Sequence, residues 1–311
     1  MHGAHAEGVL RGERHDGRGA EGAEVLERLE VGLDAGAAAG VGTRDGEGDS
    51  HLAKDALQSL IRDLQRRRGR ERRGLALAEG VRLVEEALAA GVPFRGVVTG
   101  PSLDATPRGR ALDDALRAAG VVPERLDDRE LLALADTEHP QGIVAVIEPR
   151  AWTLDDVHPA PGDALLVLDA VQDPGNVGSL LRTAHALGAA AVVALPGTAE
   201  LTNPKTLRAT MGAFFRFPCI STDAEAFFAW ATAHGVETWA ADAAGTPIAH
   251  VPPRTGRPPV ALAVGNEGAG LGADVRARAA RRVSIPMRGD AESLNVAVAA
   301  AILLHEVVRE P

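Results

Sequence analysis

The chain has 311 residues, which at about 150 residues per domain predicts two domains, each large enough to bury a hydrophobic core. Its single cysteine, Cys219, excludes an intramolecular disulfide and a cysteine-based zinc site, and we expect no metal. No apolar run reaches the roughly 20 residues of a membrane-spanning helix, and the N-terminus lacks an apolar signal core, so we expect a cytoplasmic protein without a membrane partner.

The net charge of −10 argues against a nucleic-acid partner, but this charge is unevenly distributed along the chain. Residues 1–54 contain six basic and eleven acidic residues, whereas residues 62–73 contain seven arginines and two acids. The arginine-rich segment suits contacts with phosphate groups, for which we select Arg66, Arg67, Arg68 and Arg70. The alternative is a solvated helix face without a ligand.

Residues 1–52 form an acidic extension rich in glycine and alanine, and we predict that it is disordered. It is either a functional tail or the product of a start site placed too early. Regular structure is expected from residue 53 onward.

Residues 53–150 alternate short helical and strand patterns, which predicts a small α/β domain. The expected helices are 57–64, 80–88 and 110–119, and the expected strands are 94–98 and 142–147. A proline-rich stretch follows, and we take residues 151–162 as a linker.

Residues 163–311 open with the apolar run 164–169, which lacks alternation, as expected for a strand buried on both faces of a parallel sheet. Further alternation predicts a second α/β domain. We expect strands at 190–195, 236–241 and 260–264, helices at 178–187, 203–212 and 294–308, and a polar helix at 224–234.

Three segments rich in glycine and asparagine follow or adjoin these strands. They are Asp173–Arg182, Gly265–Leu271, and Ile285–Gly289 leading to Ser293–Val296. Because loops at the carboxyl ends of parallel strands converge, the three segments predict one composite pocket. Glycine allows close backbone approach, and exposed backbone groups can bind adenine or ribose.

Each segment alone is typical of a structural turn. A nicotinamide-dependent oxidoreductase would require Gly-x-Gly-x-x-Gly and an acid about 20 residues later. The loop from Gly175 to Gly178 lacks the first of these glycines, and no acid ends the strand 190–195. The sequence therefore disfavours this class.

Together and in this order, the segments resemble the three signature motifs of the SpoU family, also called the TrmH family, of S-adenosylmethionine-dependent RNA ribose 2'-O-methyltransferases. The resemblance covers about residues 163–308. It rests on Asn176 with Arg182 six residues later, Gly265-x-Glu267-x-x-Gly270-Leu271, and Ile285-Pro286-Met287 with Ser293-Leu294-Asn295-Val296. The first half resembles the family's RNA substrate-binding domain through Arg66 to Arg73, Glu79-Gly80 and Pro140-Gln141-Gly142.

The resemblance implies a fold and a cofactor. A small α/β RNA-binding domain over 53–150 would precede a parallel-sheet SPOUT methyltransferase domain over 163–311 with a deep trefoil knot. Family members are homodimers that hold S-adenosylmethionine mainly by backbone groups. Carried over, those contacts fall on Gly265, Ile285 and Leu294.

The resemblance also implies catalytic roles. Arg182 would be the catalytic arginine; without the family match, an ion pair with an acid on the surface would be the favoured explanation. Asn176 would orient Arg182 or the RNA, or cap its helix. Glu267 would position polar groups of the RNA or cofactor, or be a solvated loop acid. Ser293 and Asn295 would act at the active site, or cap the last helix.

We therefore expect an enzyme that methylates a ribose 2'-hydroxyl in structured RNA. Ribosomal RNA is favoured over tRNA. The alternative from another class is a non-catalytic RNA-binding or ribosome-assembly factor, which the complete set of motif residues disfavours.

Overall fold

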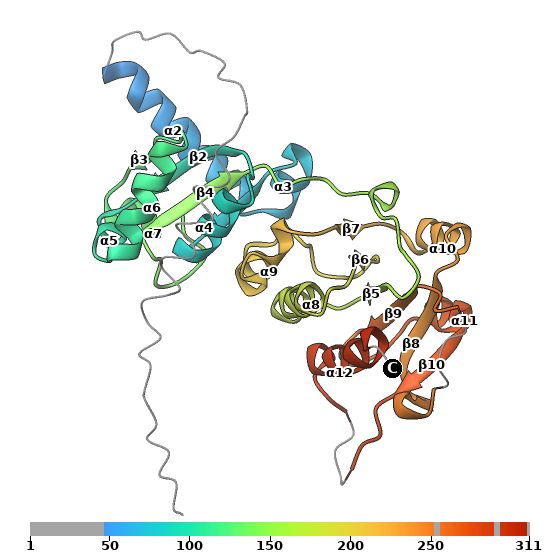
Figure 1. Ribbon diagram of the computed structural model, residues 1–311. Coiled ribbons are helices and arrows are strands. Elements are labelled where there is room, and N and C mark those ends of the chain that lie inside the picture. The colour runs from blue at the N-terminus through green and yellow to red at the C-terminus, as the bar shows by residue number, and fades with distance from the viewer. Residues whose placement is uncertain (1–46, 252–255, 289–292, 310–311) are drawn as a thin grey trace, which may run out of the picture. The chain divides into compact units, whose positions relative to one another are not determined.

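The structure is a computed structural model that describes residues 47–251, 256–288 and 293–309 (Figure 1). Residues 1–46 of the predicted extension lie outside the described residues. Helix α2 (Glu47–Leu64) begins inside the predicted extension rather than after it. No described helix has both the length and the apolar character needed to cross a membrane.

The first α/β unit contains a four-stranded mixed sheet in the order β1-β4-β2-β3. Strand β4 runs antiparallel to β1 and β2, and β3 runs parallel to β2. The strands are β1 (Ala76–Glu79), β2 (Phe94–Thr99), β3 (Glu124–Arg125) and β4 (Ile143–Ile147). The helices after α2 are α3 (Arg67–Arg73), α4 (Val81–Ala89), α5 (Pro101–Asp104), α6 (Pro107–Ala118) and α7 (Asp128–Leu132).

The second unit confirms the predicted parallel sheet, with six strands in the order β10-β8-β9-β5-β6-β7 and every neighbouring pair parallel. Its strands are β5 (Ala164–Asp169), β6 (Ala191–Ala194), β7 (Cys219–Ser221), β8 (Glu237–Pro247), β9 (Val260–Gly265) and β10 (Arg281–Ser284). Its α-helices are α8 (Pro174–Ala186), α9 (Pro204–Thr210), α10 (Ala224–Ala233), α11 (Ala273–Arg278) and α12 (Val296–Val308). The trefoil knot stays a prediction.

Strand β5 is buried on both faces, as its unbroken apolar run predicts. Leu166 and Leu168 join a core cluster with α8 and α12, while Leu165 and Val167 join a second cluster with α10 and α11 (Figure 1). Helices therefore cover both faces of the sheet.

One expectation for a segment flanking this sheet is wrong. Helix α10 is not polar, because Phe227, Phe228 and Trp230 are buried in the second cluster. In the predicted linker, Leu154–Asp156 forms a 3-10 turn and Val157 is buried against the sheet. The residues of the linker are thus part of the packed structure, and the domain boundaries stay a prediction.

Helices α8 and α9 pack unusually closely at Gly178. A Cβ atom at this position would lie 2.5 Å from the carbonyl oxygen of Thr206 and would also overlap the side chain of Ala209. Helix α9 therefore limits position 178 of the first motif to glycine.

We expect Gly178→Ala to lower the free energy of unfolding by about 1–3 kcal/mol, because the added methyl overfills the contact between the helices. Urea unfolding measures the change. Gly268→Ala is the matched control, since its Cβ would meet only the side-chain oxygen of Asn266 at 3.7 Å. Equal stability of the two variants would contradict the packing constraint.

Candidate active site

Asn176 joins the three glycine- and asparagine-rich segments. Its side-chain Nδ2 donates to Oε1 of Glu267 at 2.9 Å, and its Oδ1 accepts from Nδ2 of Asn295 at 3.0 Å. The predicted convergence of the three segments is therefore confirmed for Asn176, Glu267 and Asn295, which come from positions up to 119 residues apart.

Asn176 does not cap helix α8, so that alternative is wrong. Asp173 is the capping residue, and its carboxylate accepts from the backbone N–H of Asn176 at 2.9 Å. Pro174 occupies the first turn, where its missing N–H costs no hydrogen bond. The side chain of Asn176 is therefore available to bond residues of the other two segments.

Glu267 is exposed, but the first motif holds its carboxylate in place. Its carboxylate accepts from the backbone N–H groups of Gln172 and Asp173, each at 3.3 Å, and from Asn176. Burial raises the pKa of Glu267, but these hydrogen bonds outweigh burial and bring the pKa below the usual glutamate value. Glu267 is thus a carboxylate at neutral pH.

Asn295 caps the last helix, as one of its two expected alternatives states, and its amide nitrogen also reaches the first motif. Its Oδ1 caps helix α12 by accepting from the backbone N–H of Ala297 at 2.9 Å, while its Nδ2 bonds Asn176. Ser293 is exposed, and the residues just before it, 289–292, lie outside the described residues.

A cavity of about 570 Å³ adjoins this cluster. Its lining includes the three predicted cofactor contacts, Gly265, Ile285 and Leu294, together with Glu267, Ser293 and Asn295. At Gly265, a Cβ atom would overlap the backbone of Gly270 and Leu271. The loop of the second motif therefore packs tightly against position 265 and restricts it to glycine.

Asn266 holds the loop of the second motif, and sequence reasoning missed it. Its Oδ1 accepts from the backbone N–H groups of Gly268 and Ala269, both at 2.9 Å, and its Nδ2 donates to the carbonyl of Ala170 at 3.0 Å. Asparagine two residues before a glycine is a turn signal that could have identified it.

Arg182 is exposed on helix α8 and does not line the 570 Å³ cavity. Within the described ranges, its side chain makes no ion pair or hydrogen bond, so the surface-pair alternative has no support. Its guanidinium is available to an external anion.

The basic cluster divides into exposed and buried arginines. Arg66 and Arg68 are exposed, and Arg67 pairs with Glu71 at 2.6 Å on the surface. Arg70 is 4% exposed; it forms an ion pair with Glu200 and donates to the carbonyls of Leu64 and Gln65. The prediction that Arg70 contacts RNA therefore needs correction, because its donors are already used inside the protein.

The carboxylate of Glu200 is largely buried and would lose its ion-pair partner in Arg70→Ala. This variant should therefore lower the free energy of unfolding by about 3–5 kcal/mol. The exposed Arg68→Ala serves as control and should change it by less than about 0.5 kcal/mol. Chemical denaturation of both variants distinguishes them, and a small effect of Arg70→Ala would contradict its structural role.

No group of three or more histidine, cysteine, aspartate or glutamate side chains suited to a metal ion occurs in the described part of the chain. Cys219 is buried, and burial raises the pKa of its thiol. The thiol is therefore protonated and poorly reactive.

Family comparisons agree with the motifs. The family model described as the SpoU rRNA Methylase family matches residues 163–305, and that of the MRM3-like substrate binding domain matches residues 59–145. A solved structure, the AdoMet-bound rRNA methyltransferase from Sinorhizobium meliloti, aligns with a TM-score of 0.72 and 31% identity over 82% of this chain and 94% of that chain.

Two curated relatives match most of the chain. The 23S rRNA (guanosine(2553)-2'-O)-methyltransferase RlmP of Bacillus subtilis is 35% identical over 82% of this chain and 97% of its own length. The 23S rRNA (uridine(2479)-2'-O)-methyltransferase of Streptomyces viridochromogenes is 33% identical over 79% of this chain and 87% of its own length. With the motif residues joined around one cavity, these similarities show that the chain belongs to the SpoU rRNA methylase family.

Proposed function

We propose that the protein transfers a methyl group from S-adenosylmethionine to a ribose 2'-hydroxyl of ribosomal RNA. The observation that carries this proposal is the hydrogen-bonded set of Asn176, Glu267 and Asn295 beside a cavity of about 570 Å³. The two curated relatives described above are both named as 23S rRNA 2'-O-methyltransferases, which favours ribosomal RNA over tRNA. A ribosomal substrate would place the enzyme in the cytoplasm.

The cavity beside Gly265, Ile285 and Leu294 suits S-adenosylmethionine, because 570 Å³ lies within the range of about 300–1,000 Å³ typical of small-molecule sites. When bound, this cofactor supplies an electrophilic methyl group on a sulfonium. Backbone groups at the three positions would hold its adenosine part, and Ser293 lines the same cavity.

Arg182 supplies positive charge to the reaction. An arginine stays protonated in proteins, so it does not act as a base. Its role is to hold the phosphate of the target nucleotide and to stabilise the alkoxide that develops as the 2'-hydroxyl loses its proton. We assign the substrate phosphate as the proton acceptor.

Glu267 and Asn176 position the reacting groups. The lowered pKa of Glu267 makes its carboxylate a weak base, so it is better suited to fixing Asn176 and the first-motif loop than to removing a proton. A non-catalytic RNA-binding factor would not require this cluster together with an unpaired Arg182.

RNA binding is assigned to Arg66, Arg67 and Arg68. Arg66 and Arg68 are exposed, and the surface pair of Arg67 with Glu71 is weak enough for a phosphate to replace the carboxylate. These arginines lie within the segment that matches a substrate-binding domain. Arg70 is left out of this set for the structural reason given above.

Arg182→Ala should lower kcat for RNA methylation by a factor of about 10² or more, since one charge-stabilising group is lost from the transition state. Binding of S-adenosylmethionine should stay unchanged, because Arg182 does not line the cofactor cavity. Arg182→Lys should recover part of the rate, because it keeps the charge without the guanidinium fork. Joint loss of cofactor binding and activity would contradict the catalytic role.

We also propose that the protein is a homodimer, with helix α12 in the interface. Val298 and Ile302 lie one turn apart on this helix and are 48% and 40% exposed. Residues four apart share a helix face, so together they form an apolar stripe that a second copy would cover.

Val298→Asp should convert the dimer to a monomer, because the interface would bury an unpaired charge. Light scattering coupled to size-exclusion chromatography measures the mass. The control is Val122→Asp, which changes a 72% exposed valine in the first α/β unit and should leave a dimer. A wild-type monomer at micromolar concentration, or a dimeric Val298→Asp variant, would contradict this interface.

A further inference from the structure

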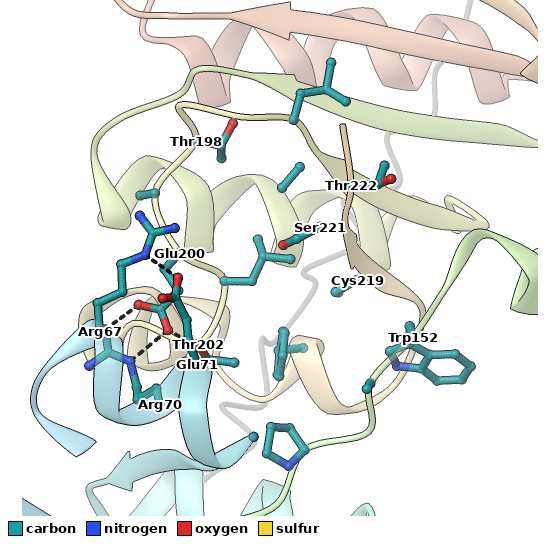
Figure 2. Close-up of a pocket in the computed structure, with 18 of the residues that line it drawn as sticks. Arg67, Arg70, Glu71, Trp152, Thr198, Glu200, Thr202, Cys219, Ser221 and Thr222 are labelled. Atoms are coloured by element: carbon teal, nitrogen blue, oxygen red, sulfur yellow. Dashed lines mark hydrogen bonds and ion pairs between the residues drawn. The ribbon is translucent and has the colours of Figure 1, made fainter. Parts of the chain in front are cut away.

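A second cavity, of about 660 Å³, opens where helix α3, the chain around residues 149–152 and the loops after β6 and β7 meet (Figure 2). Strands β6 and β7 end at Ala194 and Ser221, and both residues line it. In this parallel sheet, the carboxyl ends of β6 and β7 share an edge with those of β5 and β9, which carry the first two motif loops.

The loop after β6 connects this cavity to the catalytic loops. The backbone N–H of Ala199 donates to the carbonyl of Val171 at 2.8 Å, just before the first motif. Gly197 packs against Ala170, whose φ of 57° is unusual for a non-glycine residue. The carbonyl of Ala170 in turn accepts from Asn266 of the second motif at 3.0 Å. Ala170 therefore contacts both Gly197 in the wall of the cavity and Asn266 in the second motif.

The opposite wall belongs to the basic cluster. Arg67 and Arg70 both line the cavity and point toward Glu71 and Glu200 (Figure 2). At the rim, the guanidinium of Arg150 stacks 3.6 Å from the ring centroid of Trp152, and the side chain of Arg150 is 63% exposed. Arg150 also forms an ion pair with Asp156 at 2.9 Å, and the exposed face of its stacked guanidinium is flat enough for a ligand to stack on it.

Hydroxyl groups also line the cavity, where Ser221 is exposed and Thr222 is half-buried. Ser221 and Thr222 lie side by side at the end of β7 (Figure 2). Neither side chain makes a hydrogen bond to another residue in the ranges that the structure describes. The cavity therefore combines hydroxyl donors and acceptors with arginine at its edge.

We propose that this cavity binds an unpaired nucleotide of the RNA substrate, close in sequence to the methylated one. Arg67 belongs both to the proposed RNA-binding set and to the lining of this cavity, and the loop after β6 connects the cavity to the motif loops. Single-stranded RNA is recognised by stacking of bases on arginine or aromatic groups and by hydrogen bonds to their edges. The proposal rests on the proposed function and names a subsite of the same substrate.

The test is to fill the cavity with Ser221→Phe and to compare it with Ser59→Phe, the same change at an exposed position of α2. We expect Ser221→Phe to raise KM for ribosomal RNA about tenfold, equivalent to about 1.4 kcal/mol of binding free energy. Affinity for S-adenosylmethionine and the melting temperature should match those of Ser59→Phe. A KM equal to that of the control would overturn the subsite.

A crosslinking experiment tests the subsite by a second measurement that does not depend on KM. The photoreactive amino acid p-benzoylphenylalanine replaces Ser221 or Ser59 in the full chain, which is then irradiated with ribosomal RNA. Crosslinks from position 221 should map within a few nucleotides of the methylated ribose, and those from position 59 should not. Absence of crosslinks from position 221, while methyl transfer is intact, would overturn the subsite but not the proposed function. Absence of methyl transfer by the wild-type protein would instead contradict the proposed function.

Discussion

The site depends on one side-chain amide, that of Asn176, which donates to Glu267 and accepts from Asn295. An amide can do both, whereas an ionised carboxylate only accepts and an ammonium group only donates. The side chain of Asn176 can make both bonds because Asp173, and not Asn176, caps α8. Three loops that are far apart in the sequence are thereby fixed beside one cavity.

Helix α8 is connected to the first α/β unit through its contact with α9. Gly178 brings α8 against α9, and Arg208 of α9 bonds Asp136 at 2.6 Å and Glu79 at 3.4 Å. Glu79 is buried and also accepts from the backbone N–H of Asp136 at 2.7 Å. Direct contacts thus connect the segment that matches a substrate-binding domain with α9, which packs against α8.

Sequence patterns predicted the features that follow from local rules. The unbroken apolar run of β5 indicated a strand buried on both faces, and loops after parallel strands were expected to converge. The burial of Arg70 could not be predicted, because its partner Glu200 is 130 residues away. Likewise, Asp173 and Asn176 both stand near the start of α8, and Ser293 and Asn295 both stand near the start of α12. The sequence does not show which of these side chains caps the helix and which bonds a residue of another loop.

The central claim is that the loops joined by Asn176 carry out ribose methylation. The most direct measurement is transfer of labelled methyl from S-adenosylmethionine into ribosomal RNA from a host that lacks this gene, followed by mapping of new 2'-O-methyl nucleotides. We predict label at one ribose, transferred at least about 100-fold more slowly when Arg182 is alanine. Lack of label in ribosomal RNA and assembling ribosomal particles, despite measurable binding of S-adenosylmethionine, would contradict the account.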